Sequence, residues 1–276
     1  VKVTRTGTDT ADVFSSLSQG GTLLDSHTET DGSGIANNFG MLGVWANSNV
    51  FGSTNSAGLN VDNGITFSNI KIEVADGAIS ELVNDNFADE DRTQTGSSDA
   101  NWWSSSSTSG NSVEIDANGL GLVSGTSGRG LHGTFTPQTL DIGGSVTATL
   151  TFTTPTTVGT NKSGALKIAL MDYNDAGLAA DLLSTGSSSN PLYENLPGYM
   201  VEFDVNKADD SDDIGVRKHS VPNTVGRFLG TTSSSEWTAL GDGANVGYGF
   251  AANTEYVVVV KVTRTGTDTA DVFSSL

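Results

Sequence analysis

Short segments in which apolar and polar residues alternate recur along the whole chain. Ile70, Ile72 and Val74 alternate with charged residues, and Val1 and Val3 alternate with Lys2 and a threonine near the start. A period of two residues is that of a strand with one buried face. The same reading predicts strands at residues 1–5, 12–17, 22–27, 41–45, 65–74, 79–87, 113–115, 119–123, 131–135, 146–153, 165–172, 199–204, 215–219, 226–229, 247–250 and 256–262.

Glycine-rich and polar turns separate these segments. Gly20 and Gly21 form one turn signal, and Asp76-Gly77 forms another. Only residues 178–184 have a pattern compatible with a helical turn. Many short strands without an apolar period of 3.6 residues predict an all-β protein, an antiparallel sandwich or barrel.

One 17-residue string stands at both ends of the sequence. VKVTRTGTDTADVFSSL occupies residues 1–17 and, letter for letter, residues 260–276. A fixed internal period defines the folding unit, and 259 residues, the distance between the two copies, suit one β domain. Three origins fit: a window on a tandem array, a circular permutant with redundant ends, or a chain in a repeating polymer with arbitrary ends. In each case the chain is cut or permuted within the domain.

The domain boundaries follow from this repeat. Residues 1–76 are expected to be the C-terminal part of one unit, and residues 77–276 the N-terminal part of the next unit, or of the same unit if the chain is permuted. Each copy is expected to form a β-hairpin, and residues 260–276 should hold the hairpin's place, because the strand at 256–262 runs into them without a break. We favour the array or the polymer; in the array, residues 75–78 would be a short, stiff junction. Pairing of 70–74 with 79–83 in the same copy, with residues 1–17 disordered, would contradict it.

Several segments resemble a known family. Asn84-Asp85-Asn86-Phe87-Ala88-Asp89 followed by Trp102-Trp103 resembles the opening of a LamG-like domain, and residues 65–73 resemble its closing strand. Arg129-Gly130-Leu131, the strand at 166–171 and the hairpin that begins at residue 256 are also similar to it. The resemblance covers nearly the whole unit. It implies a two-sheet antiparallel jelly roll of the concanavalin A-like kind, found in secreted bacterial surface proteins and glycan-binding modules, and a range of functions from adhesion to catalysis.

Composition narrows the functions. The formal net charge is −19, and cysteine is absent. Such a surface repels nucleic acid and attracts cations. The sequence has no run of 18 apolar residues, so we expect no membrane insertion. The low hydrophobic fraction of 36% and the 34 glycines suit a β protein with many exposed turns.

Two groups of residues are candidates for catalysis. Glu114 and Asp116 resemble the Glu-x-Asp core of jelly-roll glucanases, but the second catalytic carboxylate that retaining hydrolysis requires is missing. Arg217 and His219, with Glu202 on a neighbouring strand, resemble the groups by which jelly-roll lyases abstract a proton. The paired Gln-x-His and Tyr-x-Lys-x-Gly motifs of those lyases are absent from the sequence. Solvated edge acids and a mixed-charge surface strand are the alternatives, and we expect no enzyme.

Tryptophans and acidic loops are the candidates for binding. Trp45, Trp102, Trp103 and Trp237 could stack on sugar rings or fill the core. If their strand is extended, Trp102 and Trp103 face opposite ways, so at most one of them is core. Calcium favours oxygen-rich loops, and the loop acids that could hold it are Asp85, Asp89, Asp91, Asp209, Asp210, Asp212 and Asp213.

The leading hypothesis is a non-catalytic structural or adhesive repeat domain of an extracellular or cell-surface bacterial protein or filament. Its partners would be neighbouring copies of itself, end to end, with polysaccharide as a further ligand class. A carbohydrate-binding module is the alternative, and a polysaccharide lyase or glycoside hydrolase is a distant third.

Overall fold

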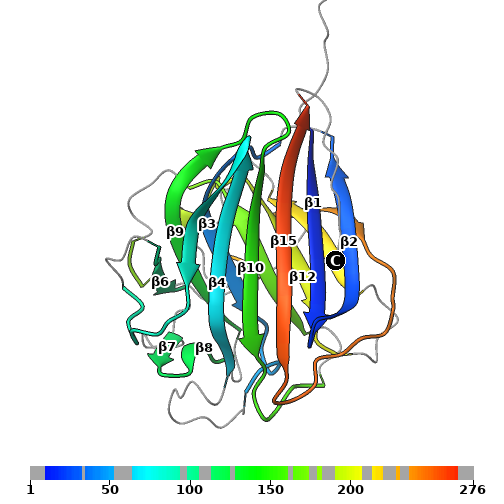
Figure 1. Ribbon diagram of the computed structural model, residues 1–276. Helices are drawn as coiled ribbons and strands as arrows, with labels where there is room; N and C mark the ends of the chain where they lie inside the picture. The colour runs from blue at the N-terminus through cyan, green and yellow to red at the C-terminus, as the bar shows by residue number, and fades with distance from the viewer. Residues whose placement is uncertain are drawn as a thin grey trace, which may run out of the picture.

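The chain forms an all-β sandwich of two antiparallel sheets (Figure 1). The structure is a computed structural model that describes residues 10–32, 35–52, 64–93, 98–105, 113–124, 128–160, 164–173, 179–181, 190–206, 213–219, 228–230 and 236–266. Within these ranges the only helix is the 3-10 turn η3, Pro191–Tyr193. The expectation of two antiparallel sheets and no long helix is therefore confirmed for this part of the chain.

The first sheet has eight strands and lies in front in Figure 1. Seven of them follow the order β2-β1-β15-β10-β4-β8-β7, and β5 pairs with β4 beside β8. Their bounds are β1 Thr10–Gln19, β2 Thr22–Asp31, β4 Ile65–Asp76, β5 Ala78–Asp85, β7 Val113–Asp116, β8 Gly119–Leu122, β10 Ser145–Thr153 and β15 Glu255–Gly266.

The second sheet has seven strands and lies behind the first. Its order is β14-β13-β12-β11-β3-β9-β6. The bounds are β3 Asn38–Ala46, β6 Asn101–Ser104, β9 Arg129–Thr139, β11 Ala165–Met171, β12 Gly198–Asp204, β13 Ile214–His219 and β14 Trp237–Asp242.

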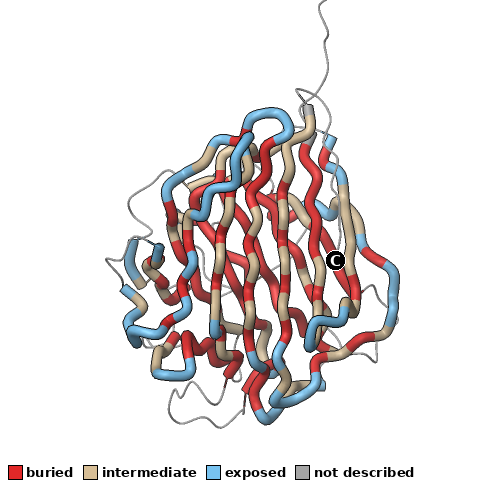
Figure 2. Tube along the Cα trace, viewed as in Figure 1, coloured by how far each residue is buried: buried red, intermediate tan, exposed pale blue. Residues whose placement is uncertain are grey.

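Alternation along the strands builds the core between the sheets. In β10, Val146, Ala148, Leu150 and Phe152 are fully buried, while the intervening threonines lie on the outer face (Figure 2). Burying every second side chain is what fixes the register, since a slip by one residue would turn the apolar set to solvent. The outer face of β10 is therefore polar, and its inner face belongs to the core.

The seven-stranded sheet is covered on both faces. Every residue of β11 is buried, and Leu166, Ile168 and Leu170 belong to the core between the sheets. The residues between them point the other way, where a second cluster covers the sheet. That cluster consists of Met41, Trp45, Ala169, Met171, Tyr193, Leu196, Met200, Phe228, Leu229 and Trp237.

The two copies of the repeat together build one antiparallel strand pair. Strand β15, which contains the start of the second copy, pairs with β1, which contains the end of the first copy. Val262 lies opposite Val13, and Val258 lies opposite Leu17. The expectation that residues 260–276 alone supply both strands is thus wrong for the second strand. The place beside β15 is taken by β1, whose first eight residues have the same sequence as residues 269–276. Residues 1–9 and 267–276 lie outside the described residues.

Strands β4 and β5 form a hairpin within the same chain. Ile72 pairs with Val83 and Ala75 with Ile79, and the chain reverses at Gly77, whose φ of +86° suits glycine. This pairing contradicts the expectation that residues 75–78 are a junction between units, because they form a turn within one sheet. The other condition stated against the array, disorder of residues 1–17, does not hold for Thr10–Leu17 in β1. Residues on both sides of Gly77 share the same two sheets in this chain.

Most predicted strands are present, with different ends. Two predictions are wrong: residues 247–250, and the described part of 226–229, form no strand. Tyr248 and Phe250 alternate with glycine as in a strand, but they enter the core from a loop. The predicted strands did not include β6 and β14. Of residues 178–184, only 179–181 are described, and they are not helical.

Replacing Leu150 with alanine should lower the free energy of unfolding by about 2–5 kcal/mol, because a fully buried central side chain leaves a cavity. Thr149→Ala, one residue away on the outer face, is the matched control and should change it by less than about 0.5 kcal/mol. Denaturant unfolding measures both. Equal effects would contradict the assignment of the two faces of β10.

Candidate functional site

A row of charged side chains crosses the outer face of the seven-stranded sheet. Lys167 on β11, Glu202 on β12 and Arg217 on β13 come from three neighbouring strands. The Nζ of Lys167 lies 3.2 Å from Oε1 of Glu202, and the Nε of Arg217 donates to Oε2 of the same carboxylate. Lys167 is only 3% exposed. Burial lowers the pKa of Lys167, and the neighbouring Glu202 carboxylate opposes that effect.

These contacts occupy the groups that a lyase would need. Both oxygens of Glu202 accept from cations, so the carboxylate is a structural counter-ion in this arrangement. Lys218 lies on the opposite face of β13, as predicted, and its Nζ contacts Oδ2 of Asp31 at 2.8 Å. Lys167 is not among the site residues predicted from the sequence, although a lysine inside the apolar segment Ala165–Met171 is a signal of a buried ion pair.

His219 is buried beside Trp237. Its Nδ1 donates to the backbone carbonyl of Leu196 at 2.8 Å, and its ring centroid lies 4.7 Å from that of Trp237. Burial lowers the pKa of His219 from 6.5 to about 4. The imidazole is therefore neutral at pH 7, and only 1% of the residue is exposed.

A second histidine is buried on the same face. His132 packs edge-on against Tyr193 and Phe228, with ring centroids 6.0 and 6.1 Å away. Phe228 also lies over Gly43, where an added Cβ would come within 2.7 Å of the ring. Tyr193 of η3, Phe228 and Leu229 thus fill the space over this part of the sheet.

The glucanase-like acids lie on a different sheet from His219. Glu114 and Asp116 are on β7, at the end of the eight-stranded sheet. Oδ1 of Asp116 accepts from the backbone N–H of Asn118, so this carboxylate caps the β7–β8 turn. The structure does not bring these two acids together with the other candidate catalytic residues.

Three of the four tryptophans are buried. Trp45, Trp102 and Trp237 are at most 3% exposed. Trp103 is half-buried and points away from the core, as expected from the alternation with Trp102. The guanidinium of Arg92 lies 5.9 Å from the centre of the Trp103 ring. The described tryptophans therefore do not form one continuous aromatic platform.

Asp85 belongs to the core rather than to an open loop. Its Oδ2 accepts from the indole N–H of Trp102 at 2.8 Å, and its Oδ1 accepts from the backbone N–H of Phe87 at 3.0 Å. Burial raises the pKa of Asp85. The side chain thus fixes the Trp102 indole at the sheet edge.

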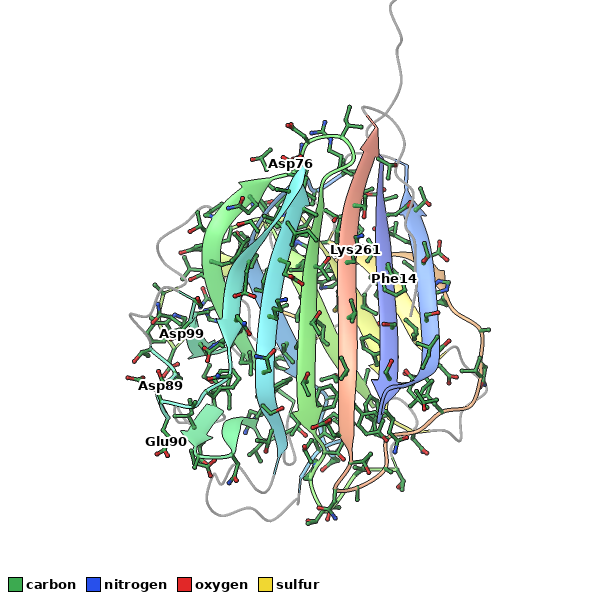
Figure 3. The ribbon with its side chains drawn as sticks, viewed as in Figure 1. Phe14, Asp76, Asp89, Glu90, Asp99 and Lys261 are labelled. Carbon is green, nitrogen blue, oxygen red and sulfur yellow. The ribbon has the colours of Figure 1, made fainter. Side chains whose placement is uncertain are left out.

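Asp89 and Asp91 stabilise the exposed loop that follows. Each accepts a hydrogen bond from the backbone two residues further on, at Asp91 and Thr93 respectively. Asp89, Glu90 and Asp99 gather on the same side of the molecule in Figure 3. These loop acids thus differ in role from the buried Asp85. Asp85 accepts a hydrogen bond from the Trp102 indole, whereas Asp89 and Asp91 accept hydrogen bonds within turns.

The other acidic cluster is described at one position. Asp209, Asp210 and Asp212 lie outside the described residues. Oδ2 of Asp213 accepts from the backbone N–H groups of Val246 and Gly247, at 2.6 and 2.7 Å. Among the described residues, no set of three His, Asp or Glu side chains has a geometry that could hold a metal ion.

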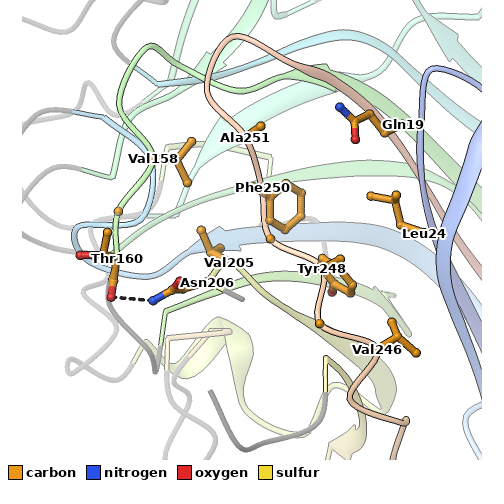
Figure 4. A pocket seen from close by; sticks show the side chains of 13 residues that line it. Gln19, Leu24, Val158, Thr160, Val205, Asn206, Val246, Tyr248, Phe250 and Ala251 are labelled. Carbon is orange, nitrogen blue, oxygen red and sulfur yellow. Dashed lines mark hydrogen bonds between the residues drawn. The ribbon is translucent and has the colours of Figure 1, made fainter. Parts of the chain in front are cut away.

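A pocket of about 620 Å³ opens at one end of the sandwich. Tyr248 and Phe250 form part of its wall, and the amides of Gln19 and Asn206 lie at its edge (Figure 4). Asn206 Nδ2 donates to the carbonyl of Thr160 at 2.8 Å. The sequence does not reveal this pocket, because segments far apart in the chain line it.

Together, the sheets and their covered faces define a two-sheet antiparallel β-sandwich. Comparisons of this chain with protein-family models, with curated proteins and with solved structures find no match. In the part of the chain that the structure describes, no helix is long and apolar enough to cross a membrane.

Acidification should destabilise the protein through His219. The unfolded histidine takes up a proton near pH 6.5, but the folded one only near pH 4, so the unfolded state binds more protons in between and stability falls as the pH falls. The loss from this residue should be on the order of 3 kcal/mol. His219→Asn can still donate to Leu196 but does not titrate. The difference between the unfolding free energies of wild type and variant, measured from pH 7 to pH 4, should shrink; a constant difference would contradict a neutral buried His219.

Proposed function

We propose that this chain is a non-catalytic, extracellular structural or adhesive repeat domain, a LamG-like jelly roll of the concanavalin A-like kind. The proposal rests on the antiparallel pair of β1 and β15, which is assembled from the two copies of the repeat. Thr10 pairs with Gly266, and the copy of Thr10 that follows Gly266 in the sequence is Thr269. Wherever the period continues, β15 of one unit thus leads, after two residues, into the β1 sequence of the next.

The chemistry of the outer face supports a non-catalytic role. Glu202 is paired with Lys167 and Arg217, and His219 is neutral and buried. A general base must reach the proton that it removes, and these side chains are already engaged in the packing of the sheet. Each candidate group for lyase chemistry therefore has a structural partner.

The surface composition fits an extracellular role with copies of itself as partners. The polar outer face of β10, together with a net charge of −19, keeps units soluble and disfavours nucleic acid. A structural calcium remains a prediction of the acidic loops; if one binds to the folded state, chelation should lower the melting temperature by mass action.

Carbohydrate binding is the second candidate function. Trp103, the tryptophan that is not fully buried, is favourable for it, and so is the pocket of about 620 Å³ whose wall includes Tyr248 and whose edge carries the amides of Gln19 and Asn206. Aromatic faces together with a few amide groups are the usual composition of a sugar site.

A chain lengthened by one further period of 259 residues, so that the repeat occurs three times, tests the proposed function. The short connection between units should make it a stiff rod, about twice as long as the single unit in small-angle X-ray scattering. Both units should unfold at one temperature. Two freely reorienting particles, or a second unit that does not fold, would contradict assembly in series.

Glycan-array screening tests the alternative. For a carbohydrate-binding module, Trp103→Ala should abolish binding, because it removes the one tryptophan side chain that is not buried. Trp45→Phe, which changes a buried ring, is the control that should retain binding. Release of unsaturated oligosaccharides from a uronate polysaccharide, lost in His219→Asn, would instead identify a lyase and contradict the proposed function.

A further inference from the structure

We propose that the position beside β15 has two interchangeable occupants in the same chain: residues 10–17, which fill it in this structure, and residues 269–276. The inference rests on the proposed function for its role, the linking of successive units. Its test uses the single chain, so that its failure and the failure of serial assembly can be told apart.

The first argument is chemical identity. Eight of the ten residues of β1, Thr10–Gln19, occur again as residues 269–276. Val13 and Leu17 are fully buried against the core, and their counterparts are Val272 and Leu276. Because the two copies have the same side chains and would meet the same β15 and the same core in this position, the second copy can make the same contacts there as the first.

The second argument is the register of the observed pair. Gly266 lies opposite Thr10, and the copy of Thr10 in the second repeat, Thr269, follows Gly266 after two residues. Two residues are the commonest connection of a β-hairpin. Residues 269–276 can therefore reach this position by a direct turn and keep the observed register when the same bulge, at Thr265 of β15, is formed.

Two opposing effects decide which copy is bound. Closing the short loop after Gly266 costs less chain entropy than joining two ends of the chain, which favours the second copy. The first copy continues into Ser18 and Gln19, which also pair with β15, opposite Val257 and Tyr256. It then turns through Gly20 and Gly21, both with positive φ, directly into β2. These extra contacts favour the first copy.

A charge placed in each copy tests the redundancy in the full chain. Val13→Asp puts a carboxylate into the core, but residues 269–276 should replace the damaged strand. The reference variant is Val258→Asp, at a buried β15 position outside the repeat, whose melting temperature should fall by about 10 °C or more. The melting temperature of Val13→Asp should fall by no more than about a third of that amount. Val272→Asp alone should change little. The double variant Val13→Asp/Val272→Asp should fall as far as Val258→Asp.

Engineered disulfides identify the occupant directly, since the sequence has no cysteine. Phe14 lies opposite Lys261 on the neighbouring strand (Figure 3), and its counterpart in the second copy is Phe273. Opposite residues of an antiparallel pair are close enough for a disulfide. Phe14→Cys/Lys261→Cys and Lys261→Cys/Phe273→Cys should both oxidise within the monomer and retain the wild-type melting temperature.

Two results would overturn the proposal. One is a fall in melting temperature for Val13→Asp as large as that for Val258→Asp. The other is oxidation of the Phe14 pair without oxidation of the Phe273 pair, or with loss of folding when the Phe273 pair is closed. A rod-like chain of two periods combined with either result would leave serial assembly in place and remove only the exchange of strands.

Discussion

The pairing of β1 with β15 is the interaction on which the rest of the sandwich depends. β2 reaches the eight-stranded sheet only through β1, and β2 in turn contacts β13 and β14 of the other sheet. At that contact, Asp31 of β2 accepts from Tyr199 and from Lys218. Loss of the β1–β15 ladder would detach β2 and leave the Asp31 carboxylate without these partners, which is costly for a group buried in this way.

Burial of the seven-stranded sheet on both faces determines the chemistry of its side chains. A strand such as β11, buried along its whole length, can hold Lys167 only because Glu202 lies opposite on β12. The same covering keeps His219 neutral and turns Trp237 into a packing residue. Glu202, Arg217 and His219, which resemble catalytic residues in the sequence, thus have polar partners that allow this face of the sheet to be buried.

The period of two residues predicted the sandwich well because strands such as β10 and β4 bury one face and turn the other toward solvent. The site was harder to predict, since sequence spacing does not reveal depth. Asp85 sits in an acidic stretch but bonds to a buried indole, and Tyr248 and Phe250 alternate like a strand yet pack from a loop. Strand β14 was missed because Trp237 is followed by exposed and half-buried residues without clear alternation.

The exact repeat limits in another way what can be predicted from the sequence. Hydrophobic pattern and propensity assign the same strand to residues 10–17 and 269–276, because the two are chemically one sequence. Which copy pairs with β15 is decided by the lengths of the closing loops and by the few flanking pairs at Ser18 and Gln19, and these are properties of the connection. A β-sandwich whose first and last strands are neighbours can therefore be closed on itself or continued into another unit through the same contacts. The small difference in free energy between these two states, rather than the strength of the ladder, determines whether such a chain stays single or joins a series.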